Sequence, residues 1–185
     1  MAAAVERLDE REYRRVWARF ERQFEFRPGM DSAGWPAIRE PADSVTWSLA
    51  GLDDDPDYLK LDAMVEAVND GLWACTGPEE TLLILDWHHD CYRIRPHAIT
   101  AADGPHWPAS MMPDGDYSIH LAEDLRYGTF GHPWEYTICV LGAPLLERVA
   151  ARLDEILVTR VREGGPGPAR RRRKSFWAML KRDGR

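Results

Sequence analysis

Three stretches of the chain repeat apolar residues at the three- and four-residue spacing of an amphipathic helix. The first spans residues 5–26, the second residues 58–77 and the third residues 143–161. Pro28 follows the first stretch and Gly77 closes the second, and both residue types are typical of helix ends. The pattern therefore predicts an N-terminal, a middle and a C-terminal helix.

Shorter apolar stretches follow the pattern of β-strands. Residues 82–85 are apolar without interruption, which indicates a central strand that is covered on both faces. Residues 124–135 contain two glycines and are predicted to connect two strands through a bend. The predicted strands are residues 44–49, 82–85, 92–95, 117–122 and 136–142. We predict the α+β class, with an antiparallel β-sheet of about five strands packed by the three helices.

The chain length of 185 residues suits one domain with a single core. Residues 1–163 are predicted to form this α+β domain. The segment GGPGPA, residues 164–169, has the composition of a linker, and the residues after it are strongly basic. Residues 164–185 are therefore expected to form a linker and a flexible basic tail.

Charge is distributed unevenly along the chain, whose formal net charge is −7. Residues 160–185 contain ten basic and two acidic residues, while residues 1–159 contain 14 basic and 29 acidic residues. The acidic body favours a protein partner with a basic surface, because opposite charges steer encounter. Nucleic acid or an anionic membrane is expected to bind only through the tail cluster Arg170–Lys174.

The cysteines and the lengths of the apolar runs indicate the compartment of the protein and its relation to the membrane. Cys75, Cys91 and Cys139 form no CxxC pair, which favours reduced, buried thiols and a cytoplasmic protein. A thiol nucleophile paired with a histidine is the less favoured reading of Cys91. We find no apolar run long enough to predict a transmembrane segment and no N-terminal signal peptide.

Three motifs in the middle of the chain resemble those of a known family. They are LDW-x-H at residues 85–89, PDGDY at residues 113–117 and FGHPWE at residues 130–135. Together they resemble an uncharacterised bacterial domain-of-unknown-function family, DUF2716, over residues 45–146. The resemblance implies one small intracellular domain, and it implies no reaction, cofactor or partner. The matching positions are Asp86, Trp87, His89, Pro113, Asp114, Gly115, Tyr117, Gly131, His132, Pro133, Trp134 and Glu135.

Four polar residues of these motifs are the candidate catalytic residues: Asp86, His89, His132 and Glu135. Imidazole and carboxylate groups at strand ends can act as acid and base, or bind a metal with His120 as a further ligand. These residues show no metal-ligand spacing within one element, so no metal and no cofactor is predicted. The simpler alternative is that they form hydrogen bonds with the backbone at turns.

Aromatic residues offer a second type of site. The chain has eight tryptophans, and several lie in predicted turns beside histidine and aspartate. Such rings can stack on a small ligand, or they can form a tryptophan-rich edge of the core. The candidate ligand-binding residues are Trp87, Trp107, Tyr117 and Trp134.

Two functions are compatible with these features. The first is a binding or interaction domain, immunity- or regulator-like, that presents an aromatic-rich pocket or face to a basic protein or a small ligand. The alternative is a small hydrolase-like enzyme that uses His132, His89 and a carboxylate. The enzyme hypothesis requires these side chains to meet around one pocket, which the binding hypothesis does not.

Overall fold

An eight-stranded antiparallel β-sheet runs through the computed structural model, which describes residues 3–99 and 107–164. The strand order is β1-β4-β3-β5-β6-β7-β2-β8, and each neighbouring pair is antiparallel. Short 3₁₀ helices occur at Ser32–Gly34, Ala50–Leu52 and Pro96–Ala98. The strands and α-helices are β1 Val5–Arg7, α1 Glu10–Phe24, β2 Ser44–Ser48, α2 Leu59–Cys75, β3 Leu82–Asp86, β4 Tyr92–Ile94, β5 Ser118–Ala122, β6 Gly128–His132, β7 Thr137–Leu141, α3 Ala143–Leu157 and β8 Arg160–Glu163.

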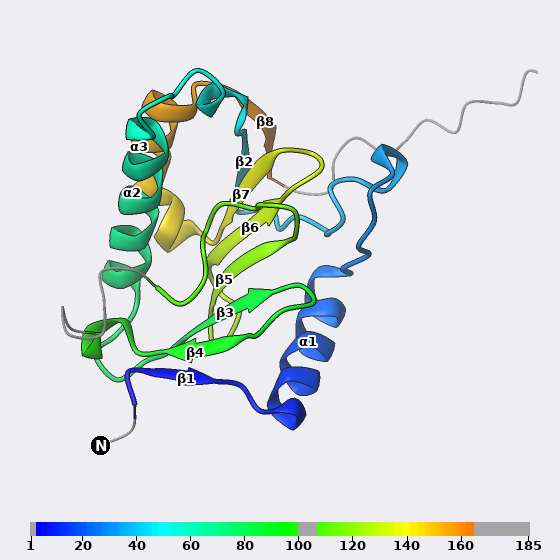
Figure 1. Ribbon diagram of the computed structural model, residues 1–185, viewed down its shortest axis with the longest axis vertical. Coiled ribbons are helices and arrows are strands. Elements are labelled where there is room, and N and C mark those ends of the chain that lie inside the picture. The colour runs from blue at the N-terminus through cyan, green and yellow to red at the C-terminus, as the bar shows by residue number, and fades with distance from the viewer. Residues whose placement is uncertain (1–2, 100–106, 165–185) are drawn as a thin grey trace, which may run out of the picture.

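The sheet separates two apolar layers (Figure 1). Helix α1 covers one face, and helices α2 and α3 pack together on the other. Strand β3 shows how one segment serves both layers, because successive side chains point to opposite faces. Leu83 and Leu85 face α1, while Leu82 and Ile84 face α2 and α3. The uninterrupted apolar run therefore belongs to a strand buried on both sides, as predicted.

The α+β class and the antiparallel sheet are confirmed, but the number of strands is corrected from about five to eight. Strand β1 occupies the start of the predicted first helix, which begins only at Glu10. Asp9 ends the extended segment by accepting a hydrogen bond from the Glu12 backbone N–H at 2.8 Å, as an N-cap does. The predicted third helix ends at Leu157, and strand β8 follows it.

Strand β6 replaces the predicted connection, and its glycines allow neighbouring segments to approach it closely. A Cβ at Gly128 would lie 2.2 Å from the His120 carbonyl oxygen, and one at Gly131 would lie 3.1 Å from Pro113. A glycine inside a strand commonly marks such a contact. The two glycines therefore fit a strand between β5 and β7.

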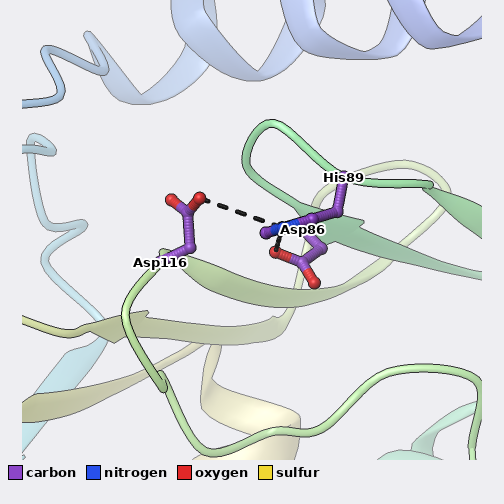
Figure 2. A group of neighbouring side chains, drawn as sticks. All are labelled: Asp86, His89 and Asp116. Atoms are coloured by element: carbon purple, nitrogen blue, oxygen red, sulfur yellow. Dashed lines mark hydrogen bonds and ion pairs between the residues drawn. The ribbon is translucent and has the colours of Figure 1, made fainter.

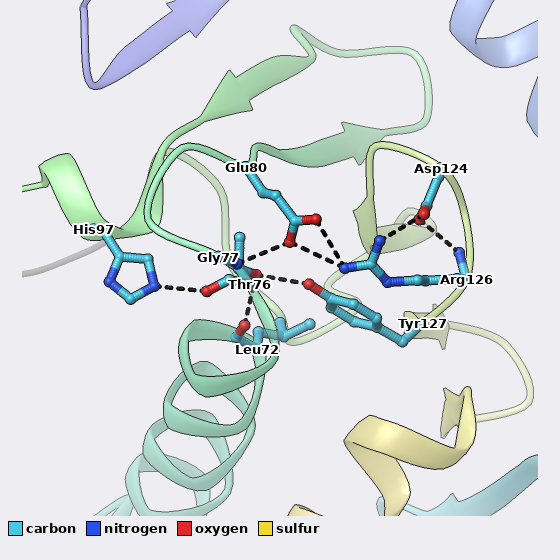
Figure 3. A network of polar contacts seen from close by, with 8 residues as sticks. All are labelled: Leu72, Thr76, Gly77, Glu80, His97, Asp124, Arg126 and Tyr127. Atoms are coloured by element: carbon cyan, nitrogen blue, oxygen red, sulfur yellow. Dashed lines mark hydrogen bonds and ion pairs between the residues drawn. The ribbon is translucent and has the colours of Figure 1, made fainter.

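The C-terminal end of α2 is held by a polar network (Figure 3). The Thr76 hydroxyl donates to the Leu72 carbonyl at 2.7 Å and also bonds the Tyr127 hydroxyl at 2.8 Å. Arg126 binds Glu80, whose carboxylate accepts from the Gly77 backbone N–H at 2.8 Å. These contacts join the end of α2 to the loop between β5 and β6.

Within residues 3–99 and 107–164, none of the helices has both the length and the apolar content needed to cross a membrane. The predicted tail cluster Arg170–Lys174 lies outside the described residues.

Candidate functional site

The predicted site residues other than Trp107 and His120 collect at one end of the sheet, where β3 and β6 end and β5 and β7 begin. Asp86, the last residue of β3, is paired with Ser118 of β5. Ser118 is paired in turn with Gly131, the residue before His132 in β6. Since antiparallel neighbours run in opposite directions, the β3–β4 turn, the segment before β5 and the β6–β7 turn share this end.

Asp86, His89 and Asp116 form a cluster at this end, which we call the Asp–His cluster (Figure 2). His89 Nδ1 lies 3.0 Å from Asp86 Oδ1 and 3.9 Å from Asp116 Oδ2. The turn between β3 and β4 passes through His88, whose φ of 69° is left-handed. This tight turn returns the chain over the end of β3, so that His89 meets Asp86.

Asp116 is the member of the Asp–His cluster that sequence reasoning missed. Its side chain is only 15% exposed, and Oδ1 accepts a hydrogen bond from the Tyr117 backbone N–H at 3.0 Å. The available signal was the second aspartate of the PDGDY motif, directly before a predicted strand. Spacing alone did not connect it with Asp86, because the pairing of β3 with β5 is what brings the two carboxylates together.

A groove of about 660 Å³ opens beside the Asp–His cluster. Arg7 and Asp90 form an ion pair of 2.9 Å on its wall, which ties strand β1 to the β3–β4 turn. Glu10 and Asp86 add two further carboxylates to the lining. The groove is therefore more acidic than basic. Its lining residues are Arg7, Leu8, Glu10, Tyr13, Asp86, His88, His89, Asp90, Cys91, Tyr92, Pro108 and Ala109.

The electrostatics of the cluster favour a positive charge. The hydrogen bond to Asp86 raises the pKa of His89, with a further contribution from Asp116. One ligand atom from each of Asp86, His89 and Asp116 lies within 4.8 Å of the others, a nitrogen and two oxygens suited to a divalent cation. A proton on the imidazole, an ammonium or guanidinium group, or a metal ion would thus be stabilised at the same place.

His132 has a different environment, because its side chain is buried with an exposed fraction of 0%. Its Nδ1 accepts a hydrogen bond from the Glu135 backbone N–H at 3.0 Å, which closes the β6–β7 turn. The rings of Trp35 and Tyr117 contact it edge to face, with centroid distances of 5.4 and 4.9 Å. Burial lowers the pKa of His132 to about 4, so the imidazole is neutral near pH 7.

Glu135 belongs to a largely buried ion network. Its carboxylate accepts two hydrogen bonds from Arg162, at 2.6 and 2.7 Å. Arg162 also binds Glu40, whose side chain is only 2% exposed, and Thr46 donates to the same carboxylate at 2.7 Å. The network connects the β6–β7 turn with β2 and with the edge strand β8.

The four candidate catalytic residues thus form two groups. Asp86 and His89 are in direct contact beside the open groove, whereas His132 and Glu135 make their contacts within the β6–β7 turn and with Arg162. Within the part of the chain that the structure describes, no hydrogen bond or ion pair joins one group to the other.

The aromatic candidates also divide between two places. Trp87, Tyr117 and Trp134 pack together on the α1 face, with centroid distances of 5.2 to 6.5 Å. This cluster also contacts His132, and Tyr117 is completely buried. Trp107 instead belongs to the opposite layer, where its ring lies 5.8 Å from that of His120.

Cys91, which lines the groove, and Cys139, in the middle of β7, are both buried. Burial raises the pKa of Cys139 to about 12, and it also raises the pKa of Cys91. The Cys91 sulfur contacts the backbone carbonyls of Asp86 and His89 at 3.6 and 3.8 Å. Both groups are therefore protonated near pH 7, which disfavours a thiolate nucleophile.

Comparisons with known proteins agree with the sequence motifs. A family model described as "Protein of unknown function (DUF2716)" matches residues 7–146, a range that includes α1, the Asp–His cluster and the β6–β7 turn. The chain is also similar to "Uncharacterized protein YxiI" of Bacillus subtilis (strain 168), with 37% identity over 75 residues.

The YxiI match covers 40% of this chain and 46% of that protein, so the chain matches about half of the relative's length. No solved structure matches the chain. The family model, in contrast, covers most of the chain and includes all three motifs that suggested the resemblance. This chain belongs to the DUF2716 family of proteins of unknown function.

Proposed function

We propose that this chain is a binding domain and that a basic segment of a partner protein enters the groove beside the Asp–His cluster. The observation that carries the proposal is the convergence of Asp86 and Asp116 on His89 at the open end of the sheet. The two carboxylates have oxygen atoms within 4.8 Å of each other, so both can accept hydrogen bonds from one lysine or arginine side chain. Such charge-assisted hydrogen bonds are among the strongest that proteins form.

The charge of the domain supports the same type of partner. Residues 1–159 contain 29 acidic and 14 basic residues, which gives the body a negative field that attracts a basic surface. An immunity- or regulator-like role would use such a field. We further propose a cytoplasmic location, and the free thiols Cys75, Cys91 and Cys139 suit a reducing compartment.

The proposal is tested by affinity capture from a bacterial extract with the full chain and two variants. The Asp86→Asn/Asp116→Asn variant removes both carboxylate charges of the cluster while keeping side-chain size. Asp114→Asn is the matched control, because this exposed aspartate lies two residues from Asp116. Circular dichroism establishes that both variants fold, and calorimetry then measures the affinity of any captured protein.

We expect a basic protein that the full chain and Asp114→Asn both bind. The Asp86→Asn/Asp116→Asn variant should bind it at least about tenfold more weakly, which corresponds to about 1.4 kcal/mol. Binding should also weaken with added salt. Equal affinity of the two variants, or no partner whose capture depends on the cluster, would contradict the proposal.

A hydrolase-like enzyme is the alternative, and the contact of Asp86 with His89 is the observation that favours it. A carboxylate 3.0 Å from an imidazole can orient the ring as a general base. His132 is completely buried, which does not favour the catalytic role that the sequence predicts for it. Ester hydrolysis that is lost in His89→Asn and retained in Asp114→Asn would favour the enzyme, whereas equal background rates would remove it.

A further inference from the structure

A second cavity lies on the face of the sheet that α2 covers, and its polar groups point to a ligand of different chemistry. It has a volume of about 230 Å³, and its lining residues are Val65, Asn69, Trp107, Ala109, Ser110, Met111 and His120. An apolar cavity of about 150 Å³ is known to accommodate benzene, so this space is sufficient for a single small ring. His120 is the only one of these residues with a titratable side chain.

His120 lines this cavity, and one of its ring nitrogens is buried without a hydrogen-bond partner. Its side chain is 1% exposed, and Nδ1 has no hydrogen-bond partner. The ring also makes a hydrogen bond with the Ala109 backbone that favours the protonated form, as a carbonyl acceptor does. Since Nδ1 is unpartnered, this bond belongs to Nε2–H, and Nδ1 is left with a free lone pair.

Thr129 adds a second polar group on the same face. It is paired directly with His120 across β5 and β6, and residues so paired point to the same side of the sheet. Its side chain is 1% exposed, and Oγ1 also lacks a hydrogen-bond partner. Thr129 lies beside His120 but is not one of the residues that line the cavity. A buried polar atom without a partner is costly, so a group that bonds to His120 Nδ1 gains free energy.

The rest of the wall selects for an uncharged, flat molecule. The Trp107 ring lies 5.8 Å from the His120 ring with an interplanar angle of 30°, so the two rings together form an aromatic part of the wall. Val65 and Met111 add apolar contacts. Burial lowers the pKa of His120 to about 4, so no positive charge is available to hold an anion near pH 7.

We propose that this cavity binds a small, uncharged ring compound that stacks on Trp107 and donates one N–H or O–H hydrogen bond to His120 Nδ1. The inference goes beyond the proposed partner binding, because it involves neither Asp86 nor Asp116. Ala109 lines both the cavity and the groove. A ligand in the cavity can therefore affect binding in the groove through the backbone around Ala109.

The test uses phenol and toluene as probes of the full chain, because they have similar shape and only phenol donates a hydrogen bond. Binding is followed by NMR, with the backbone amides of Ala109 and Thr129 as reporters. Trp107→Ala removes the stacking surface. Trp73→Ala is the matched control, since Trp73 is an α2 tryptophan with 50% exposure that does not line the cavity.

We expect phenol to bind at least about tenfold more tightly than toluene, and Trp107→Ala to weaken phenol at least about tenfold while Trp73→Ala has no effect. His120→Leu should abolish the preference for phenol over toluene and retain toluene binding. The ratio of phenol affinity to toluene affinity can be compared in every variant that folds, and a cooperative thermal transition establishes folding. Equal binding of the two probes by the unmodified chain, no binding of either, or shifts confined to other amides would overturn the proposal. None of these outcomes depends on whether the groove binds a partner.

Discussion

The Tyr117 hydroxyl is bonded on both sides by one residue of the loop after α1. It accepts a hydrogen bond from the Gly29 backbone N–H at 3.1 Å and donates one to the Gly29 carbonyl at 3.2 Å. The side chain is completely buried, and its ring packs between Phe26 and Phe130. Tyr117, a candidate ligand-binding residue by sequence, thus contributes to the fold by holding this loop against the sheet.

We predict that Tyr117→Phe lowers the free energy of unfolding by about 1–2 kcal/mol, because both backbone groups of Gly29 lose a partner. Urea denaturation measures the effect. Tyr92→Phe is the control, since the hydroxyl of Tyr92 has no described hydrogen bond, and its midpoint should not change. Equal midpoints for the two variants would show that the Gly29 contacts contribute little.

The sequence located the important side chains better than it described their environments. The motifs identified His89 and His132 as equivalent candidates. The structure leaves the first 63% exposed beside a carboxylate and buries the second completely. This difference depends on α1 and the loop after it, which cover one face of the sheet and are far from both histidines in sequence.

At the scale of elements, the contact between α2 and α3 depends on Gly71. A Cβ at this position would lie 2.4 Å from Val149 Cγ1 and 2.9 Å from Leu145 Cδ1. Both distances are below van der Waals contact, so any larger residue forces the two helices or their side chains to move. A glycine inside a helix normally lowers the stability of the helix, and this close contact explains why glycine occupies position 71.

We predict that Gly71→Ala destabilises the protein by about 1–2 kcal/mol, since overpacking costs more than the gain of about 1 kcal/mol in helix propensity. The same change in a Val149→Ala background should cost less, because the closest contact is then removed and only the flexible end of Leu145 has to move. A double-mutant cycle by thermal denaturation measures this coupling. Additive effects of the two substitutions would show that Val149 does not limit the approach.

The sequence predicted those elements whose hydrophobic period was long or uninterrupted. It missed β1, β6 and β8, which have three to five residues each. Strands β1 and β8 directly adjoin helices and were included in the helical periods, although Asp9 and Glu12 form a recognisable N-cap pattern. Strand β6 carries two glycines that resemble a turn signal, and only the three-dimensional packing shows why they are needed.

For the molecule as a whole, two buried histidines make stability depend on pH. Burial lowers the pKa of His120 and His132 from the ordinary 6.5 to about 4. A lowered folded-state pKa means that the unfolded chain binds protons first as pH falls. Stability is therefore full above pH 6.5 and decreases towards pH 4, by about 3 kcal/mol for each histidine. His89 acts in the opposite sense, since its pKa is raised, but it is exposed and contributes less.

We predict that the free energy of unfolding falls continuously between pH 6.5 and pH 4, and denaturant titrations across this range measure the slope. His132→Asn should reduce the slope by about half, because one of the two groups no longer titrates. His88→Asn, a change at an exposed histidine, is the control. A flat profile above pH 4.5 would mean that neither imidazole is as shielded as its burial suggests.

Net charge yields a second prediction at this scale. Residues 1–159 are strongly acidic and the segment Arg170–Lys174 is basic, so retention on heparin at low salt should require the tail. A chain that ends at Gly164 is expected to lose this retention and to keep the thermal transition of the domain. Retention by the shortened chain would place the anion-binding surface in the body.

The position of β2 in the sheet has a consequence for synthesis on the ribosome. Its partners are β7 and β8, although β2 is made about 90 residues before β7. At 5–20 residues per second, the wait lasts about 5–20 seconds. Helices α1 and α2 can form locally during this time, whereas Val45 and Trp47 remain in an unpaired strand. A chaperone that samples the nascent chain would therefore find an apolar target in this early strand, and synonymous codons that slow translation between β2 and β7 would prolong that exposure.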